Sequence, residues 1–420
     1  MCDTKPVGFH DVHMVELSLF SQGGPVKYFY HRIYHRSCKI LIIIMKYYLI
    51  AGEASGDLHG SNLMKGIKKA DKDADFRFFG GDMMHAQGGK LVKHYRDMAF
   101  MGLFKVLMNI CSIRKNFQLC KNDILSYQPD VIILIDFAGF NLRMAKFISK
   151  SGLRVFYYIS PKVWVWNKSR VKTIKQVIER MFVILPFEVD FYKQFDYDVE
   201  YLGNPTLDAI AEKFDNKNDS DNFIQRNQLG VKPIIALLPG SRTQEIERCL
   251  PEMLAVIPDY SAYQFVIAAS PGVNRNLYKR YIGNTDVHIV YNQTYDLLKY
   301  SIAAIVTSGT ATLETALMDV PEVVCYKTGS LSYFIGKLVV RLQFFSLVNL
   351  IMGKEVVKEL LQFHLKERIS AELDRILYDE DYRTAMLKNF KELRKTLGEP
   401  GASWRIGRKI VDLVKSDQKV

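Results

Sequence analysis

Hydrophobic and polar residues follow one another along most of the chain in a pattern that predicts short buried strands separated by amphipathic helices. In the first half, the strand-like runs rich in β-branched and aromatic residues are 47–51, 76–79, 131–135, 155–159 and 181–185. Helical spacing extends from about Asp57 to Ala70, between the first two runs. Strands separated by helices are typical of βαβ units around a parallel sheet. The first half is therefore predicted to be a Rossmann-like domain.

The alternation stops near residues 203–205 and resumes after a polar stretch at 213–222, which is rich in turn-forming residues and predicts a hinge or insertion. The later strand-like runs are 233–238, 264–268, 287–290, 303–307 and 322–326. The predicted fold class is therefore α/β, with two Rossmann-like, doubly wound domains. Ligands of such sheets bind outside the carboxyl ends of the strands, so we expect the two domains to face a shared cleft.

The first 44 residues do not fit this pattern. Residues 1–38 show no sustained hydrophobic period, and an apolar run at 39–44 leads directly into the first strand-like run. The joined segment is too long for one buried strand. Met45 is therefore interpreted as the true start and 1–44 as a poorly ordered extension; the alternative is an anchor or an added edge strand. A signal peptide is not indicated, because acidic residues precede the apolar run and no small-residue cleavage site follows it.

Composition narrows the class of protein. The 420 residues suggest two or three domains, and the 48% of hydrophobic residues predict a large core rather than a disordered chain. The six cysteines show neither C-x-x-C spacing nor clustering with histidine. Neither a disulfide framework nor a metal site is therefore indicated, and a reducing cytoplasm is the expected location.

The formal net charge of +12 favours an anionic partner, whether nucleic acid, a phospholipid surface or a phosphorylated substrate. Nucleic acid is disfavoured, because the basic residues are dispersed and no nucleic-acid-binding signature occurs. No apolar run reaches the ~18–20 residues that span a bilayer. Any contact with a membrane is therefore expected to be peripheral.

The first candidate site is the segment after the first strand-like run, where Gly52, Glu53, Ser55, Gly56 and Asp57 lie between a strand and a helix. Glycines permit a tight turn and the amides at a helix start attract anions or hydroxyls. The alternative is an ordinary turn in which Ser55 or Asp57 caps the helix. The spacing is not G-x-G-x-x-G, which argues against a dinucleotide site.

Asp136 directly follows the most apolar run, 131–135. A carboxylate at the mouth of a buried strand is a candidate general base, since burial and neighbouring charges tune its pKa. The alternative is that Asp136 caps the helix that begins near Gly139. After the next run, Trp164 lies in an aromatic segment that is suited to stacking on a sugar or lining an acyl groove; packing in the core is the alternative.

Two segments of the second half suit phosphate. Ser241 and Arg242 follow the run 233–238, and an arginine fork after a glycine matches the geometry of a diphosphate. Ser308, Gly309 and Thr310 repeat this arrangement after the run 303–307. Glu314, one helical turn on, is placed to accept from ribose hydroxyls. In both segments the alternative is a simple capped turn, with Thr310 as the cap in the second.

Two further apolar segments are candidates for lipid contact. A helical stripe within 334–345 carries two basic residues, which suits an anionic bilayer surface, and the run 98–108 is rich in Met and Phe, which suits acyl chains. Packing within the protein is the alternative for both. The segment 353–362 is predicted to be a helix.

Six segments in one order resemble a known family. They are Gly-Glu-Ala-Ser-Gly-Asp (52–57), Ile-Asp-Phe-Ala-Gly-Phe-Asn (135–141), Ser-Pro-Lys-Val-Trp-Val-Trp (160–166), Leu-Pro-Gly-Ser-Arg (238–242), Ser-Gly-Thr-Ala-Thr-Leu-Glu (308–314) and Asn-Leu-Ile-Met-Gly-Lys-Glu-Val-Val-Lys-Glu-Leu-Leu-Gln (349–362). Together, over Met45 to the C-terminus, they resemble the lipid-A-disaccharide synthase family. The extension at 1–44 and the polar stretch at 213–222 depart from the family pattern.

The resemblance implies a GT-B glycosyltransferase without cofactor or metal, with an acceptor domain at 45–205, a UDP-sugar domain at 206–385 and a helical segment at 386–420 that crosses back to the first domain. It implies transfer from UDP-2,3-diacylglucosamine to the 6-hydroxyl of 2,3-diacylglucosamine 1-phosphate, with inversion to a β-linkage. It also implies a peripheral location at the cytoplasmic face of the inner membrane, against an anionic surface. A homodimer and a monomer both remain open.

Residue by residue, the resemblance implies that Asp136 is the general base or positions the acceptor, and that Arg242 holds the diphosphate. It assigns Ser308, Gly309, Thr310 and Glu314 to the phosphates and ribose, and it places Asn349 and Gln362 near the donor. Two alternatives stay open from the residues themselves. One is a GT-B enzyme that adds N-acetylglucosamine to a polyprenyl-linked acceptor, and the other is a non-catalytic protein that binds nucleotide sugars.

Overall fold

The computed structural model describes residues 44–98, 110–166, 168–215, 222–270, 272–329 and 343–416. The chain divides into two units, Met1–Ile44 and Met45–Val420, and every described helix and strand lies in the second unit. Within these residues the strands form two sheets, one of seven and one of six strands, and all pairs are parallel.

The seven-stranded sheet has the order β3-β2-β1-β4-β5-β6-β7. Its strands are β1 (Lys46–Ala51), β2 (Asp75–Gly80), β3 (Lys90–His94), β4 (Val131–Ile135), β5 (Val155–Tyr158), β6 (Arg180–Val183) and β7 (Glu200–Tyr201). The strand order reverses between β1 and β4, which is the point where ligands of doubly wound sheets bind. Ala51 pairs with Ile135 there, so both strands end at the same level.

The six-stranded sheet repeats this plan in the order β10-β9-β8-β11-β12-β13. Its strands are β8 (Ile234–Leu238), β9 (Gln264–Ala269), β10 (His288–Tyr291), β11 (Ser301–Thr307), β12 (Glu322–Tyr326) and β13 (Lys358–Leu361). The order reverses between β8 and β11, where Leu238 pairs with Val306. The loops after these two strands therefore begin side by side.

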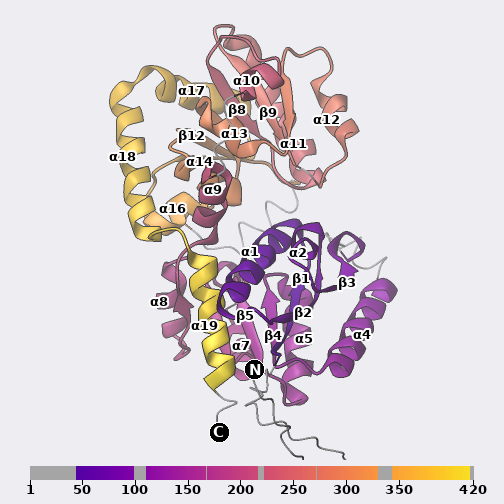
Figure 1. The fold of residues 1–420 in the computed structure, drawn as a ribbon. Coiled ribbons are helices and arrows are strands. Elements are labelled where there is room, and N and C mark those ends of the chain that lie inside the picture. The colour runs from indigo at the N-terminus through magenta and orange to yellow at the C-terminus, as the bar shows by residue number, and fades with distance from the viewer. Residues whose placement is uncertain are drawn as a thin grey trace, which may run out of the picture. The chain divides into compact units, whose positions relative to one another are not determined.

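Helices connect the strands on both sides of each sheet (Figure 1). Around the first sheet they are α1 (Ala54–Ala70), α2 (Asp82–His85), η1 (Tyr95–Asp97), α4 (Ile110–Tyr127), α5 (Ala138–Lys150), α6 (Val163–Trp166), α7 (Arg170–Val177) and α8 (Phe187–Lys193). The remaining helices are α9 (Pro205–Asp215), α10 (Phe223–Arg226), α11 (Thr243–Leu254), η2 (Ile257–Asp259), α12 (Arg275–Ile282), α13 (Thr294–Lys299), α14 (Thr310–Leu317), α16 (Leu347–Met352), α17 (Leu365–Tyr378), α18 (Glu380–Leu397) and α19 (Ala402–Ser416).

The last helix packs against the first. A Cβ built on Gly407 of α19 would lie 2.6 Å from the backbone carbon of Gly66 in α1, so only glycine permits this approach. The amino end of α19 is capped by Asp208, whose carboxylate accepts hydrogen bonds from the amides of Gly401 at 2.6 Å, Ala402 at 3.0 Å and Ser403 at 2.7 Å. Helix α19 thus packs on α1, a helix of the first sheet (Figure 1).

The predicted alternation of strands and helices is confirmed, with local corrections. The helix predicted from Asp57 begins three residues earlier, at Ala54. The helix predicted at 353–362 is wrong, because 358–361 form β13 and pair with β12. The amide oxygen of Asn349 binds the backbone N–H groups of Val356 and Val357 at 2.7 and 3.0 Å, which prevents a helix from continuing there.

Parts of the predicted lipid-contacting segments lie outside the described residues, namely 99–108 and 334–342. Of the predicted polar stretch 213–222, residues 213–215 belong to α9, and 216–221 lie outside the described residues. None of the described helices combines the length and the hydrophobicity that crossing a bilayer requires.

Candidate functional site

The loops after β1 and β4 meet where the order of the first sheet reverses. A Cβ built on Gly52 would lie 2.3 Å from the ring of Phe137, so a side chain at position 52 would displace the aromatic ring. Asp136 and Phe137 have φ of 43° and 47°, a left-handed conformation that non-glycine residues rarely adopt. Such strained backbone persists where surrounding contacts enforce it, and it occurs often at functional sites.

Two side chains fix the turn at Asp136 through its carbonyl oxygen. The side-chain amide of Asn141 donates to the carbonyl oxygen of Asp136 at 2.9 Å, and the hydroxyl of Tyr157 donates to the same oxygen. Phe137, rather than Asp136, occupies the N-cap of α5. The carboxylate of Asp136 is therefore not used as a helix cap.

The pKa of the Asp136 carboxyl is raised above its usual value because burial disfavours the charged form. The ammonium of Lys162, the backbone N–H of Phe137 and the guanidinium of Arg242 act in the opposite direction. A buried carboxylate whose pKa is raised is a stronger base than an exposed one, which suits the role of a general base.

Glu53 brings a second carboxylate to the same place. Its Oε2 lies 3.5 Å from Nη2 of Arg242. Burial raises the pKa of Glu53, Arg242 and Lys162 oppose the rise, and the negative charge of Asp136 adds to it. Glu53, Asp136, Lys162 and Arg242 therefore interact as one group, which we call the charge cluster.

Lys162 was not among the site residues predicted from the sequence, although it lies in the segment 160–166. It is exposed and follows β5, the strand next to β4. Its position after a parallel strand at the same sheet edge was the available signal, because loops at that edge converge. The aromatic residues of this segment favour Trp164 as the candidate instead.

Trp164 itself is buried. Its indole N–H donates to the carboxylate of Glu188 at 3.2 Å, and its ring packs edge-on against Phe187 with centroids 5.0 Å apart. This is the core packing that the sequence left open as the alternative. Burial raises the pKa of Glu188 to about 7.

The other predicted residues of the first loop lie within helix α1. Ser55 is exposed in the first turn, and Gly56 packs on β1, where an added Cβ would lie 3.2 Å from the Cβ of Ala51. Asp57 is buried, and its carboxylate accepts the backbone N–H groups of Gly81, Met83 and Met84 at 2.8, 3.1 and 3.0 Å. Asp57 thus holds the start of α2.

In the second sheet, Ser241 and Arg242 follow β8 and precede α11. Their backbone N–H groups donate to Oε2 of Glu245 at 3.1 and 3.2 Å, and Nη1 of Arg242 donates to Oε1 of Glu245 at 3.0 Å. The turn is therefore capped, as the alternative interpretation had it. The side chain of Arg242 is nevertheless 52% exposed and so accessible to a diphosphate.

The loop after β11 holds Ser308, Gly309 and Thr310 beside the loop after β8. Gly309 is the N-cap of α14 and supplies no side chain, so the alternative of a Thr310 cap is wrong. The hydroxyl of Ser308 donates to the carbonyl of Phe345 at 3.0 Å. Glu314 accepts from the hydroxyl of Tyr295 at 3.0 Å, and burial raises its pKa.

Asn349 and Gln362 use their amide groups within the protein. Nδ2 of Asn349 donates to the carbonyl of Val357 at 2.8 Å and to Glu359 at 2.9 Å. The side chain of Gln362 binds both backbone groups of Thr328. Its Oε1 accepts from the N–H of Thr328 at 3.1 Å, and its Nε2 donates to the carbonyl oxygen of Thr328 at 2.9 Å. Both side chains fix the loops that follow β12 and precede β13.

In the described ranges, no three or more His, Cys, Asp or Glu side chains are grouped so that they could hold a metal ion.

The sequence matches a family described as lipid-A-disaccharide synthetase over residues 47–402. It is 38% identical over 375 residues to the lipid-A-disaccharide synthase of Syntrophus aciditrophicus, covering 87% of this chain and 97% of that protein. It is 37% identical over 376 residues to the lipid-A-disaccharide synthase of Myxococcus xanthus, again with coverage of 87% and 97%.

Solved structures resemble the fold at low sequence identity. The UDP-GlcNAc 2-epimerase of Neisseria meningitidis, bound to UDP-GlcNAc, has a TM-score of 0.64 at 14% identity and covers 88% of this chain and 100% of that chain. The calicheamicin glycosyltransferase CalG4 has a TM-score of 0.56 at 12% identity, with coverage of 89% and 99%. These similarities, together with the two parallel sheets, confirm the predicted GT-B type of α/β fold.

Proposed function

The chain belongs to the lipid-A-disaccharide synthase family of glycosyltransferases, and from that premise we propose that it joins UDP-2,3-diacylglucosamine to 2,3-diacylglucosamine 1-phosphate. In this reaction the 6-oxygen of the acceptor forms a bond to the anomeric carbon of the donor. The bond from that carbon to the diphosphate breaks, and UDP leaves. Attack from the face opposite the leaving group inverts the anomeric carbon and gives a β-linked disaccharide 1-phosphate.

The observation that carries this proposal is the charge cluster, in which a carboxylate and a guanidinium lie within electrostatic reach of each other. Asp136 takes the proton of the 6-hydroxyl as the new bond forms. Negative charge develops on the departing diphosphate at the same time, and Arg242 stabilises it. A base and an anion-stabilising group are the two elements that an inverting transfer needs.

The loop after β11 supports binding of the nucleotide. Gly309 and Thr310 offer backbone N–H groups at the start of α14, where the helix dipole favours phosphate. Ser308 lies beside them, and Glu314, whose carboxylate accepts from the hydroxyl of Tyr295, would accept from a ribose hydroxyl through its other oxygen. Asn349 and Gln362 act as positioning residues that fix neighbouring loops.

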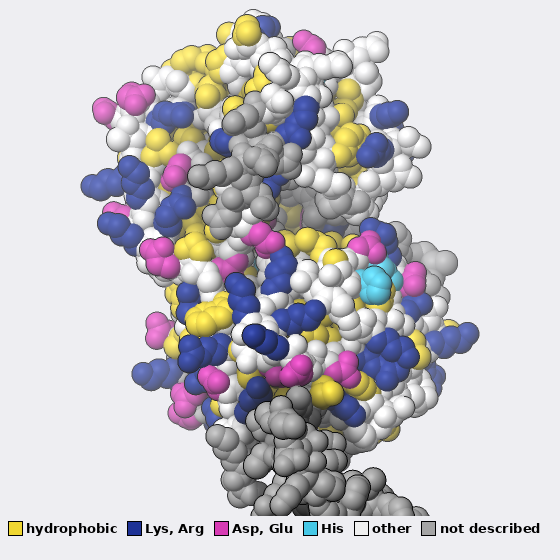
Figure 2. All heavy atoms as spheres, viewed as in Figure 1, with side chains coloured by type: hydrophobic (Ala, Val, Ile, Leu, Met, Phe, Trp, Pro, Cys, Tyr) yellow, Lys and Arg dark blue, Asp and Glu magenta, His cyan; other side chains and the backbone are white. Residues whose placement is uncertain are grey.

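Both proposed substrates carry acyl chains, so the enzyme must reach a membrane surface to meet them. We place it at the cytoplasmic face of the inner membrane as a peripheral protein. The net charge of +12 favours an anionic lipid surface. Lys and Arg side chains are abundant on the face shown in Figure 2, where Asp and Glu are fewer.

Incubation of the purified full chain with both substrates tests the proposal. Mass spectrometry should detect the disaccharide 1-phosphate together with UDP, and the coupling constant of the new anomeric proton should show a β-linkage. Asp136→Asn should abolish the product while UDP still binds, because the amide cannot accept the proton as a carboxylate does. Asp198→Asn, at an exposed position, is the control and should retain activity. If the wild-type enzyme makes no product, the proposed substrates are wrong. If Asp136→Asn shows full turnover, Asp136 is not the base.

A further inference from the structure

A second group of basic side chains lies beside the first sheet and includes no residue of the charge cluster. It is a pocket of about 230 Å³ between α5 and α7. Its lining includes Ala138 and Gly139 from the start of α5 and the basic residues Arg143, Lys146 and Arg170; none of its described lining residues is acidic. The pocket is therefore suited to an anion rather than to a neutral or cationic ligand.

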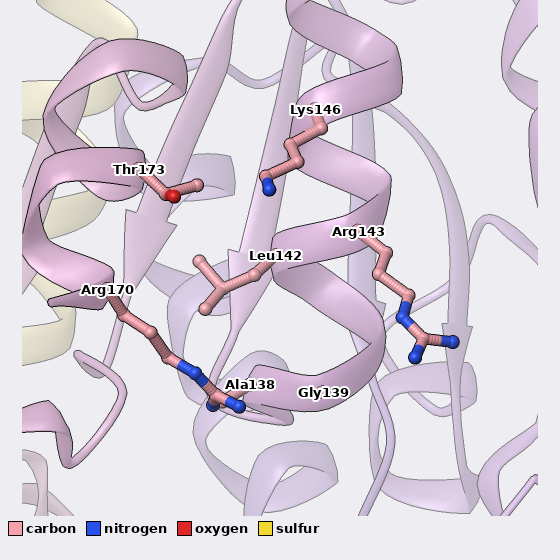
Figure 3. A pocket seen from close by; sticks show the side chains of 7 residues that line it. All are labelled: Ala138, Gly139, Leu142, Arg143, Lys146, Arg170 and Thr173. Atoms are coloured by element: carbon pink, nitrogen blue, oxygen red, sulfur yellow. The ribbon is translucent and has the colours of Figure 1, made fainter. Parts of the chain in front are cut away.

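Two basic side chains extend toward each other's helix across the pocket (Figure 3). Lys146 on α5 extends toward α7, and the guanidinium of Arg170 on α7 extends toward Ala138 at the start of α5. Arg143 extends from the other flank of α5. Neither Arg143 nor Lys146 forms an ion pair with any other described residue. No ion pair therefore neutralises the charge of Lys146, which extends toward α7, or the charge of Arg143 on the other flank of α5.

The amino end of α5 adds to the positive potential. This helix has 13 residues, and no described side chain caps its N-terminal N–H groups. A Cβ built on Gly139 would meet no atom within 4 Å, so the backbone there is open toward the pocket. Uncapped amides at a helix start donate to anions, and the helix dipole favours them.

The pocket lies next to the proposed base in the chain and in space. Ala138 and Gly139 follow Asp136 by two and three residues. The charge of Arg170 acts on Tyr157, whose hydroxyl donates to the carbonyl oxygen of Asp136. A molecule whose hydroxyl is held at Asp136 can therefore extend a second group toward the pocket.

We propose that this pocket binds the phosphate monoester of the acceptor sugar. The inference rests on the proposed function, in which the acceptor presents a 6-hydroxyl to Asp136 and carries its phosphate on carbon 1, at the other end of the same ring. A phosphate monoester offers several acceptor oxygens to a guanidinium, an ammonium and backbone N–H groups. The pocket thus orients the acceptor and selects a phosphorylated sugar over one without phosphate.

Steady-state kinetics with Lys146→Gln and Arg143→Gln test the proposal. A hydrogen bond to a charged group contributes about 1.5–3 kcal/mol, so the KM for the acceptor should rise roughly 10- to 100-fold in Lys146→Gln, while the KM for the donor stays constant. Arg143→Gln should raise the KM for the acceptor less than Lys146→Gln does. Lys146→Arg keeps the positive charge, so its KM for the acceptor should be closer to that of the wild type. Lys150→Gln, one turn further along α5 and also exposed, is the matched control. An acceptor KM that is the same in Lys146→Gln and Lys150→Gln would overturn the proposal.

A binding measurement separates this site from the reaction as a whole. Glucosamine 1-phosphate, which lacks acyl chains, should bind the wild type more tightly than glucosamine does in NMR titrations, and Lys146→Gln should remove the difference. If the wild type makes no disaccharide but this difference persists, the proposed reaction fails and the phosphate site stands. Sedimentation with phosphatidylglycerol vesicles provides a second arm. Weaker vesicle binding by Lys146→Gln with an unchanged acceptor KM would assign the pocket to lipid headgroups and refute the acceptor site.

Discussion

Glu53 and Arg242 form an ion pair across the two sheets, with Oε2 and Nη2 3.5 Å apart. Glu53 follows β1 and Arg242 follows β8, the first strand of each sheet. Arg242 also pairs with Glu245 of α11, which follows it in the chain, with Nη1 and Oε1 3.0 Å apart. A diphosphate at Arg242 must therefore compete with Glu53 for the guanidinium.

This competition predicts that Glu53→Gln strengthens the binding of UDP. The substitution removes a negative charge beside the diphosphate and frees one side of the guanidinium. An ion pair that is partly exposed to solvent contributes up to about 1 kcal/mol, so the affinity should rise by up to about fivefold at low salt. Isothermal titration with UDP measures it, and the gain should shrink at high salt because ions screen the charges.

Glu245→Gln is the informative comparison for this prediction. Glu245 also binds the backbone N–H groups of Ser241 and Arg242, so its substitution alters the turn as well as the charge. A fall in UDP affinity with Glu53→Gln would mean that Glu53 helps to hold the nucleotide, and the competition would be excluded.

The sequence predicted the inner strands better than the sheet edges. The strands that went unpredicted, β3, β7 and β13, each lie at the edge of a sheet. β3 reads Lys-Leu-Val-Lys-His and β13 reads Lys-Glu-Leu-Leu, with polar residues that an exposed edge permits. Hydrophobic runs reveal strands that are buried on both faces, whereas edge strands depend on pairing that local sequence does not encode.

The site shows a similar division. Asp136 and Arg242 were predicted because each follows a buried strand, and they interact in the structure. The sequence does not single out Lys162, because the aromatic residues of its segment favour Trp164 as the candidate. Asn349 and Gln362 were expected near the donor, yet their amides are occupied by backbone groups of the protein. Motif position identifies which loops converge, but only three-dimensional contacts separate residues that face a ligand from residues that support the loop.

Lys162→Gln is predicted to change how activity depends on pH. A base must be ionised to act, and burial raises the pKa of Asp136 above the usual 3.8, so the acid limb of kcat/KM lies above that pH. Lys162 opposes the rise, so its removal raises the pKa of Asp136 further. The acid limb should then move to higher pH, and kcat/KM at pH 5 should fall more than at pH 8.

The pH profile of kcat/KM for Lys162→Gln measures this shift, with Lys168→Gln as the control. Lys168 is exposed in the turn before α7 and should leave the profile unchanged. A uniform loss at every pH would show that Lys162 binds substrate without tuning the base.

Gly407→Ala is predicted to destabilise the contact between α19 and α1. The added Cβ would lie 2.6 Å from the backbone of Gly66, which cannot move aside as a side chain would. Overpacking of this kind costs about 1–3 kcal/mol. Urea denaturation should therefore show a lower midpoint. Gly230→Ala is the control, since its nearest atom is the side-chain Oε1 of Gln264 at 3.9 Å. Equal midpoints in the two variants would contradict the close packing.

Glu188 is predicted to make stability fall as the pH rises from about 4.5 to 7. Burial raises the pKa of this carboxyl from 4.5 to about 7, so between these values the folded state holds a proton that the unfolded state has released. The stabilisation is complete below the unfolded pKa and is lost as the pH passes the folded pKa, which amounts to roughly 3 kcal/mol at 1.36 kcal/mol per unit.

Glu188→Gln cannot titrate, so its free energy of unfolding in urea should lack this component, whereas Glu367→Gln at an exposed position of α17 should keep it. The slope with pH is the decisive quantity, because the amide introduced by the substitution would also alter the bonds to Trp164 and Leu185 by an amount that does not depend on pH. An identical slope in wild type and Glu188→Gln would show that Glu188 stays ionised beside these two donors.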